Sequence, residues 1–245
     1  MTMQLVGVGV GPGDPDLVTV KALRALRGAD AILVPATEAS EGRRGRAEQI
    51  VLDNCPEAEP RIVSVPFSMA DRSGVTERRK AAWLTSAQAA LDAFAAGATT
   101  VAFATIGDPS VYSTFSYLAA HVTAELPEVE VAVVPGITAM QALAAASLTP
   151  LVEGTETLTL VPATVGVERL SDVAEHTDTV VIYKSGRTLP AIAALLAESG
   201  RDAIVGTDVG LPGQSIRALD AETGAANYMS TIISTRPRTE TGGQL

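Results

Sequence analysis

The stretch QLVGVGVGPGDP, residues 4–15, joins an apolar run to alternating glycines and an aspartate flanked by prolines. Residues 4–10 predict a buried strand, because a short apolar run bounded by turn residues is typical of a strand inside a sheet. Residues 11–15 predict a turn in which Asp14 caps a helix with Pro15 at its first position, and Gly28 ends that helix. The chain therefore opens as strand, glycine turn and helix.

The same pattern returns twice in the first half of the chain. Apolar residues 101–105 precede a Gly-Asp-Pro turn at 107–109, and apolar residues 131–134 precede a Pro-Gly turn at 135–136. Strands buried on both faces in this way are typical of a parallel sheet covered by helices. The sequence predicts an α/β fold whose ligand lies where the strands end in these turns.

The rest of the chain continues the alternation of strands and helices. We expect an apolar helix face made by Leu84, Ala87, Leu91 and Phe94, and a loose polar tail from residue 237. Two domains are predicted, residues 1–136 and residues 137–245. Further helices are expected at residues 47–52, 78–96, 139–146 and 190–199, and further strands at residues 31–34, 158–161, 179–183, 203–206 and 228–234.

The alternating glycines superficially suggest a dinucleotide-binding turn. That fingerprint needs glycine at its first, third and sixth positions. Counted from Gly7 the sixth residue is Pro12, and counted from Gly9 it is Asp14, so neither register matches. The fold is therefore predicted not to be Rossmann-like, which disfavours a nicotinamide-dependent reductase.

Composition excludes several classes of function. With 47% hydrophobic residues among 245, the chain can bury a large core, while a net charge of −10 disfavours nucleic acid as a partner. No apolar segment is long enough to cross a membrane, so a cytoplasmic protein is expected. Cys55 is a lone cysteine and His121 and His176 are far apart, so no metal site is predicted.

One stretch is locally basic within this acidic chain. Arg43, Arg44 and Arg46 lie within four positions of one another in a loop that is expected to precede a helix. A local cluster of arginines suits a small polyanionic ligand. These three residues are the candidate substrate-binding residues.

Three motifs together resemble the tetrapyrrole methylase family, which includes the corrin-ring and uroporphyrinogen methyltransferases. They are GVGPGD at residues 9–14, GDP at residues 107–109 and PGITA at residues 135–139, and their order and spacing match over nearly the whole chain. Residues 105–118, TIGDPSVYSTFSYL, are most similar to the branch that methylates C20 of precorrin-2.

The resemblance implies a homodimer of two-domain α/β subunits, with S-adenosylmethionine in a cleft between the domains and a tetrapyrrole above it. Carried over motif by motif, it also implies a set of cofactor-binding residues. They are Pro12, Ile106, Gly107, Asp108, Val111, Thr138, Ala139, Tyr183, Lys184, Gly210, Leu211 and Thr231.

The implied chemistry is methyl transfer from a sulfonium to a ring carbon, which depends mainly on positioning and needs no metal. A group must accept the proton lost at C20, and Asp108 and Tyr112 are the candidates. The substrate's eight carboxylates fit the arginine cluster.

Several alternatives stay open on sequence alone. The substrate could be the cobalt-bearing counterpart of precorrin-2, because the two differ at the centre of the ring. The same fold also serves an rRNA ribose methyltransferase and diphthine synthase. A different class of protein is a non-catalytic S-adenosylmethionine-binding module, which turnover would exclude.

Overall fold

The computed structural model describes residues 2–36, 44–67, 76–220, 224, 226 and 229–238. Its contacts divide the chain into two compact units, Met1–Thr138 and Ala139–Leu245. The division falls two residues after the expected domain boundary, so that Thr138 and Ala139 belong to different units. Each unit contains one five-stranded sheet.

The first unit has a parallel sheet in the order β3-β2-β4-β1-β5. Because all strands run the same way, their carboxyl ends share one edge of the sheet. Strand β1 lies between β4 and β5, which brings the three glycine turns next to one another. The strands are β1 (Gln4–Gly9), β2 (Ala31–Ala36), β3 (Ile62–Pro66), β4 (Thr100–Thr105) and β5 (Glu130–Val134).

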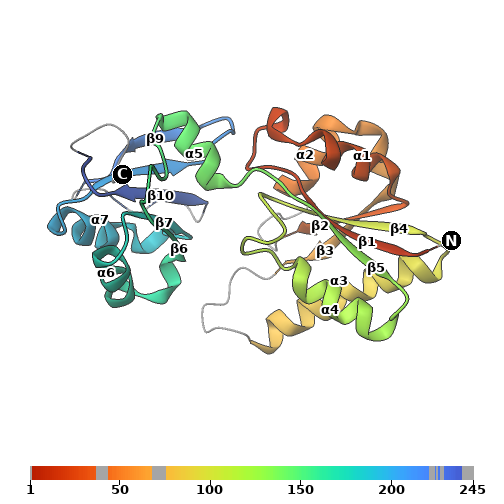
Figure 1. Ribbon diagram of the computed structural model, residues 1–245. Helices are drawn as coiled ribbons and strands as arrows, with labels where there is room; N and C mark the ends of the chain where they lie inside the picture. The colour runs from red at the N-terminus through yellow and green to blue at the C-terminus, as the bar shows by residue number, and fades with distance from the viewer. Residues whose placement is uncertain are drawn as a thin grey trace. The chain divides into compact units, whose positions relative to one another are not determined.

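Helices cover both faces of this sheet (Figure 1). Val6 and Val8 of β1 pack with α1 and α2, whereas Leu5 packs with α3 and α4, as the alternation of side chains along a strand requires. Burial on both faces explains why the interior strands β1, β2 and β4 are mostly apolar, whereas the edge strands β3 and β5 are partly exposed. The helices are α1 (Val20–Gly28), α2 (Arg46–Asn54), α3 (Glu77–Ala95) and α4 (Phe115–Glu125).

The first helix begins later than predicted. Asp14 accepts a hydrogen bond from the Asp16 N–H and starts only a single 3-10 turn, η1 (Pro15–Leu17). The Thr19 hydroxyl then accepts from the Ala22 N–H at 3.1 Å and caps α1. The prediction that the helix starts at Pro15 was wrong because the chain has a second capping residue. Thr19 follows Asp14 and starts the α-helix after the 3-10 turn has ended.

The predicted apolar face of α3 was also partly wrong. Leu84 is 52% exposed, while Ala87 and Phe94 are buried as expected. The buried stripe runs instead through Ala82, Ser86 and Ala90, where small residues let the helix approach the sheet closely. Among the described residues, the strands β3 and β9 (Ser215–Ala218) and the helix α6 (Val167–Glu175) were not predicted. A helix was expected after the Gly-Asp-Pro turn, and α4 follows that turn but begins only at Phe115.

The second unit has a mixed sheet in the order β6-β7-β10-β8-β9. Strand β10 is antiparallel to both β7 and β8, so these two run in the same direction and end at the same edge. A short 3-10 turn, η4 (Ala163–Val165), links β6 to α6, and another, η5 (Gly186–Thr188), precedes α7. The main elements besides α6 and β9 are α5 (Ala139–Ser147), β6 (Leu158–Pro162), β7 (Thr179–Tyr183), α7 (Leu189–Glu198), β8 (Asp202–Thr207) and β10 (Ser230–Thr235).

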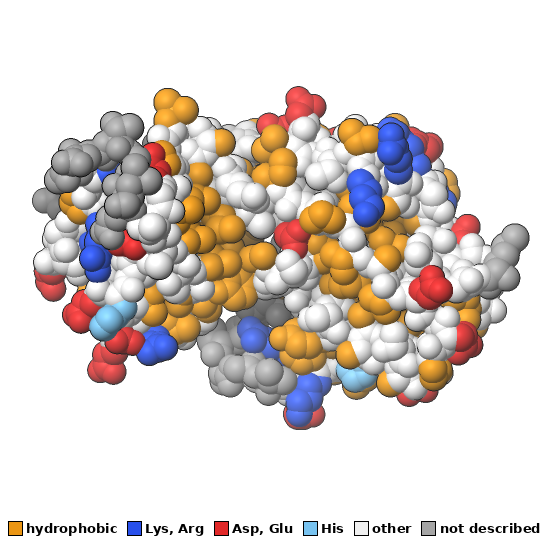
Figure 2. Space-filling model, in the orientation of Figure 1, with side chains coloured by type: hydrophobic (Ala, Val, Ile, Leu, Met, Phe, Trp, Pro, Cys, Tyr) orange, Lys and Arg blue, Asp and Glu red, His pale blue; other side chains and the backbone are white. Residues whose placement is uncertain are grey.

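The two faces of the second sheet are covered unequally. Helices α6 and α7 bury one face, but α5 packs on the other, where only Leu143, Val181 and Ile233 form the fully buried cluster among the described residues. Leu158, Leu160 and other apolar side chains around this cluster stay partly exposed. Figure 2 shows hydrophobic side chains gathered at the surface beside α5.

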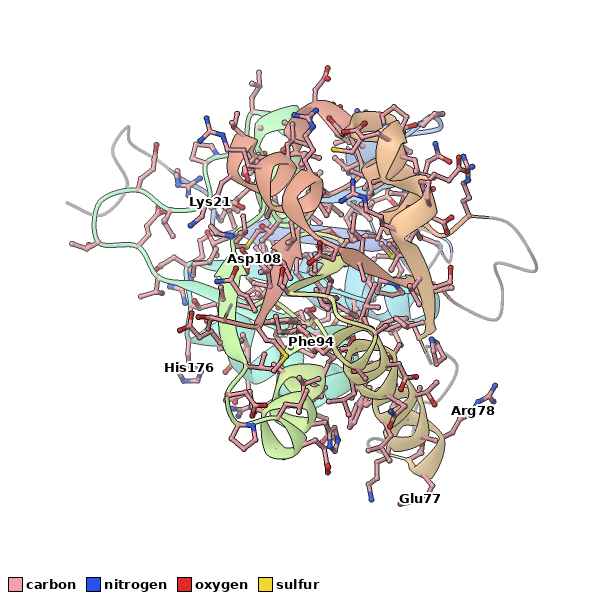
Figure 3. All side chains as sticks on the ribbon, turned by 90° about the vertical axis from the view of Figure 1, so that its right-hand side faces the viewer. Lys21, Glu77, Arg78, Phe94, Asp108 and His176 are labelled. Atoms are coloured by element: carbon pink, nitrogen blue, oxygen red, sulfur yellow. The ribbon has the colours of Figure 1, made fainter. Side chains whose placement is uncertain are left out.

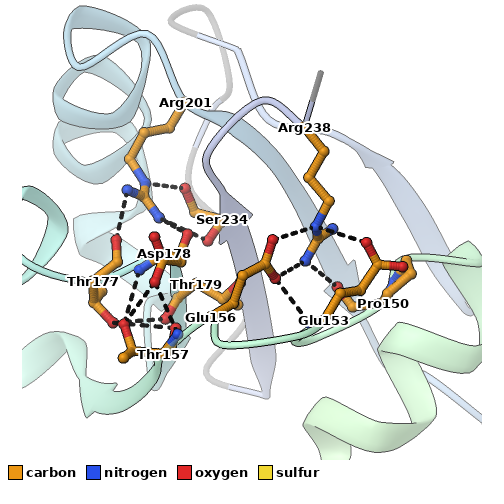
Figure 4. A network of polar contacts seen from close by, with 10 residues as sticks. All are labelled: Pro150, Glu153, Glu156, Thr157, Thr177, Asp178, Thr179, Arg201, Ser234 and Arg238. Carbon is orange, nitrogen blue, oxygen red and sulfur yellow. Dashed lines mark hydrogen bonds and ion pairs between the residues drawn. The ribbon is translucent and has the colours of Figure 1, made fainter. Parts of the chain in front are cut away.

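Arg201 joins several segments at the edge of the second sheet where β7 and β8 begin, opposite their carboxyl ends (Figure 4). Its buried guanidinium donates to the carbonyls of Ala174, Thr177, Asp178 and Ser234, and to the Ser234 hydroxyl. These acceptors use all five N–H groups, which is how a charge is buried without a carboxylate partner. The network is structural and lies away from the predicted cofactor residues of this unit.

The chain after β10 is held in place at its start. Arg238 donates to Glu156 at 2.7 and 2.8 Å and to the Pro150 carbonyl at 3.2 Å, and its Nε lies 3.4 Å from Glu153 (Figure 4). The prediction of a loose tail was therefore wrong at Arg238, because two carboxylates bind its side chain. Residues 239–245 lie outside the part of the chain that the structure describes.

Candidate functional site

The three glycine turns of the first unit are directly joined. The Val10 N–H donates to the Thr105 carbonyl at 2.9 Å, and the Gly107 N–H donates to the Gly11 carbonyl at 2.7 Å. These bonds extend the pairing of β1 with β4 into the turns beyond the strands. We call residues 9–14, 105–111 and 135–138 the turn cluster.

Glycine is required inside the turn cluster for steric reasons. A Cβ on Gly9 would lie 2.6 Å from the Gly136 nitrogen, and a Cβ on Gly136 would overlap the Gly107 carbonyl oxygen. Gly107 also has a positive φ of 72°, which side chains disfavour. The turns therefore present backbone atoms at the edge of the sheet, where side chains would otherwise lie.

Asp108 connects two of the turns. One carboxylate oxygen accepts from the Ser110 N–H at 2.7 Å and from the Ser110 hydroxyl, and the other accepts from the Gly136 N–H at 2.9 Å. The side chain is only 8% exposed. Figure 3 shows Asp108 within the fold, whereas Glu77 and Arg78 at the start of α3 project outward.

The same contacts determine the charge of Asp108. Burial by itself raises the pKa of this carboxyl, but the hydrogen bonds from Ser110 and Gly136 outweigh burial, so that the pKa lies below its ordinary value. A carboxylate in this state is a weak base, and both of its oxygens already accept hydrogen bonds. The geometry therefore argues against Asp108 as the proton acceptor.

Tyr112 follows directly on the Asp108 turn, which closes through a bond from the Val111 N–H to the Asp108 carbonyl. Its backbone has a φ of +51°, and its side chain is 42% exposed. A large residue in the left-handed region costs free energy, and such strain is concentrated at functional sites. Tyr112 is therefore well placed for a functional role at the rim of the turn cluster.

The remaining predicted residues of the first unit surround the same turns. Pro12 and Thr138 are buried, and Ile106 packs against the hydrophobic cluster beneath α1 and α2. A Cβ on Gly107 would lie 3.9 Å from the Thr138 Cα, so the second and third turns also approach each other beyond the end of β1. The predicted cofactor residues of this unit are thus brought together.

In the second unit, Tyr183 and Lys184 lie at the end of β7. The Tyr183 hydroxyl accepts from the Met140 N–H at 2.9 Å, next to Ala139 at the start of α5. Tyr183 also pairs with Thr231 of β10. Lys184 has a φ of +62°, another strained position. Ala139, Tyr183, Lys184 and Thr231, which were predicted from three separate segments, are therefore close together in this unit.

Gly210 and Leu211 lie in the loop between β8 and β9. The Leu211 N–H donates to the Asp208 carbonyl at 3.0 Å, and the Gly210 N–H donates to the Gln214 side chain at 2.8 Å. Asp208 has a φ of +50°. Because β7 and β8 end at the same edge of the sheet, this loop and Lys184 share that edge.

The arginine cluster is only partly described. Arg43 lies outside the described residues, and Arg46 is exposed at the start of α2. Arg44 forms an ion pair with Glu59 and lies 3.9 Å from Glu48. These carboxylates compensate the charge of Arg44, which weakens the expectation that it binds substrate.

Ser110 is a hydrogen-bonding partner of Asp108 that the sequence reasoning missed. The spacing Asp-x-Ser at residues 108–110 is typical of an Asx turn, in which the aspartate accepts from the backbone two residues on.

In the part of the chain that the structure describes, no group of three or more histidine, cysteine or acidic side chains could hold a metal ion. No helix among those residues could span a membrane.

A sequence model of the tetrapyrrole (corrin/porphyrin) methylases matches residues 4–223. This match covers most of the chain, including all three turns, the whole first sheet and every strand of the second sheet except β10. The chain therefore belongs to the tetrapyrrole methylases.

Particular members of the family are similar over most of their length. The precorrin-2 C(20)-methyltransferase of Sinorhizobium sp is 34% identical, over 81% of this chain and 80% of that protein. The probable cobalt-precorrin-2 C(20)-methyltransferase of Methanocaldococcus jannaschii is 37% identical, over 76% of this chain and 74% of that protein.

The fold has solved counterparts. The uroporphyrin-III C-methyltransferase of Thermus thermophilus, crystallised with S-adenosylhomocysteine, aligns with a TM-score of 0.65 and 20% identity. The alignment covers 95% of this chain and 97% of that one. At this identity the likeness concerns the fold alone, and it agrees with an α/β fold that is not Rossmann-like.

Proposed function

We propose that this protein methylates C20 of precorrin-2 with S-adenosylmethionine as methyl donor, yielding precorrin-3A. The observation that carries the proposal is the similarity to the Sinorhizobium C(20)-methyltransferase over four fifths of that protein. The turn cluster, with its sterically required glycines, supports it. The similarity to a cobalt-precorrin-2 enzyme supports the cobalt-bearing substrate as the second candidate.

The residues present fit S-adenosylmethionine. The turn cluster presents backbone N–H and carbonyl groups, and bulky side chains are excluded at Gly9 and Gly136. We expect contacts from Pro12, Ile106, Gly107, Val111 and Thr138 in the first unit. In the second unit we expect contacts from Ala139, Tyr183, Lys184, Gly210, Leu211 and Thr231.

When bound, this donor supplies an electrophilic methyl group, so the protein's own task is mainly to orient and hold the reactants. Tyr112 is the candidate to contact the tetrapyrrole, because it is half-exposed beside the turns. Arg43 and Arg46 are the candidates to bind the ring carboxylates.

We also propose a homodimer, as the family resemblance implies, which sedimentation at micromolar concentration would test.

The function is tested by anaerobic incubation with S-adenosylmethionine labelled with 13C at the methyl group and with precorrin-2 or its cobalt counterpart. We expect carbon NMR and mass spectrometry to show label at C20 of one of them. The substrate that is methylated faster shows whether the protein uses the metal-free or the cobalt-bearing ring. Binding of the donor without transfer to either tetrapyrrole would contradict the proposal and favour a binding module.

A matched pair of variants tests the site. Gly136→Ala places a methyl group against the Gly107 carbonyl, whereas Gly28→Ala at the end of α1 places the same group in open space. We expect Gly136→Ala to weaken binding of S-adenosylhomocysteine at least about tenfold, because the turns must move apart. Gly28→Ala should bind within twofold of wild type, and equal binding by both variants would place the ligand elsewhere.

A further inference from the structure

We infer that Asp108 is a positioning residue that holds the second and third turns of the turn cluster in register, and that it is not the proton acceptor. This inference rests on the proposed function, since the turns that it joins are the proposed cofactor contacts. It assigns to Asp108 a role that the motif alone does not show.

The carboxylate bridges two segments that are 28 residues apart in sequence. One oxygen binds the Ser110 N–H and hydroxyl within its own turn, and the other binds the Gly136 N–H of the turn after β5. Because β1 lies between β4 and β5, no strand pairing joins these two turns. The side chain of Asp108 therefore supplies a direct link between the second and third turns.

The link acts where close packing makes position critical. Gly136 lies so near Gly9 and Gly107 that no Cβ fits between them. Thr138, two residues further on, and Gly107, one residue before Asp108, are both proposed contacts of the cofactor. A shift of the Gly136 backbone would therefore move both sides of the turn cluster.

The same unit contains a second carboxylate with the same kind of partners. Asp30 accepts from the Thr99 N–H at 2.8 Å, the Thr99 hydroxyl at 2.9 Å and the Thr100 N–H at 2.9 Å. Each aspartate thus binds two backbone N–H groups and one hydroxyl and joins neighbouring segments. Asp30 lies at the amino ends of the strands, so it is a matched control at the opposite edge of the sheet.

The two aspartates differ in one useful respect. All three donors meet a single oxygen of Asp30, whereas at Asp108 they are divided between both oxygens. In Asp108→Asn one carboxylate oxygen is replaced by an NH2 group, which cannot accept from the donor that it faces. The remaining oxygen still accepts hydrogen bonds on its own side. This variant breaks the bridge in part, and Asp108→Ala breaks it completely.

The experiment measures S-adenosylhomocysteine affinity by calorimetry, and the pH profile of methyl transfer, for Asp108→Ala, Asp108→Asn and Asp30→Ala. We expect Asp108→Ala to bind at least about tenfold more weakly, Asp108→Asn to be intermediate, and Asp30→Ala to stay within twofold. The pH profile of Asp108→Asn should keep the shape of the wild-type profile. In the ligand-free protein, exchange of the Gly136 amide should be faster in both Asp108 variants.

Other outcomes overturn the inference. If both Asp108 variants bind like wild type but lose transfer and the acidic limb of the pH profile, Asp108 is the base. If Asp30→Ala weakens binding as much as Asp108→Ala, the effect is one of general stability. If wild type binds S-adenosylhomocysteine but methylates neither tetrapyrrole, the proposed function fails, while the affinities and the Gly136 exchange still decide the role of Asp108. A wild type that does not bind S-adenosylhomocysteine overturns both.

Discussion

At the scale of single residues, backbone strain marks the candidate site. Among the described residues, non-glycine side chains with positive φ occur at Tyr112, Leu148, Lys184 and Asp208. All but Leu148 lie within or beside segments proposed to contact the cofactor or substrate. Strain of this kind persists only where the surroundings impose it, and it is common where function needs a particular side-chain direction.

Tyr112 provides the corresponding prediction. In Tyr112→Gly, relief of left-handed strain, about 1–2 kcal/mol, offsets the lost contacts of the ring. We therefore expect a free energy of unfolding within about 1 kcal/mol of wild type, with kcat/KM for methyl transfer reduced about tenfold or more. Urea unfolding and transfer kinetics measure the two effects.

The Tyr112→Phe variant separates the ring from its hydroxyl. If the ring positions the tetrapyrrole, Tyr112→Phe should retain most of the activity. A loss in Tyr112→Phe as large as in Tyr112→Gly would instead show that the hydroxyl takes part in proton transfer. Unchanged kinetics in both variants would remove Tyr112 from the site.

At the scale of secondary-structure elements, the sequence pattern identified the strands and helices of the cofactor edge well. The runs before the glycine turns became β1, β4 and β5, and the alanine-rich segment became α5. The missed helix α6 does have a helical pattern, because Leu170 and Ala174 are buried four positions apart, so its omission is not explained by a lack of periodicity. The missed strand β3 is a half-exposed edge strand. The helix expected after the Gly-Asp-Pro turn is α4, but it begins only at Phe115, because turn residues occupy the start of this stretch.

The end of α5 allows a sharp test of element stability. The Thr149 N–H donates to the Ala144 carbonyl at 2.9 Å and the Leu148 N–H to the Ala145 carbonyl at 3.3 Å, which is the Schellman pattern. Leu148 occupies the left-handed position that glycine prefers, and it is 90% exposed. We expect Leu148→Gly to raise the free energy of unfolding of the second unit by about 1 kcal/mol.

Denaturant unfolding followed by fluorescence or circular dichroism measures this gain. Methyl transfer should be unchanged, because Leu148 lies outside the proposed contacts, and this makes the variant a control for Tyr112→Gly. A loss of stability would contradict the prediction and would show that the leucine side chain is covered in solution.

At the scale of the whole molecule, the aspartates that join segments make stability depend on pH. Backbone hydrogen bonds from Thr100 and Thr99 lower the pKa of Asp30. The backbone hydrogen bond from Thr157 likewise lowers the pKa of Asp178 in the second unit. With Asp108, both units therefore contain carboxylates that bind protons more weakly when folded than when unfolded.

A lowered folded-state pKa stabilises the native state fully above the unfolded value of about 3.9. This stabilisation is lost as the pH falls below that value and through the folded-state pKa. We expect the urea midpoint to be level from about pH 7 to 5 and to decrease steadily below about pH 4. In Asp30→Ala the urea midpoint should decrease less steeply as the pH falls. An unchanged slope in this variant would contradict the contribution of Asp30 to the pH dependence of stability.

The sequence by itself determined the local features of this protein: the strands that end in glycine turns, the absence of a dinucleotide fingerprint, the α/β class and the family. These follow from residue spacing, which reports on neighbours along the chain. The tertiary structure alone decided which distant groups meet: Asp108 with Gly136, Arg44 with Glu59, and Arg238 with Glu156. The physical reason is that such partners depend on strand order and on the path of the loops, and local periodicity carries no information about either.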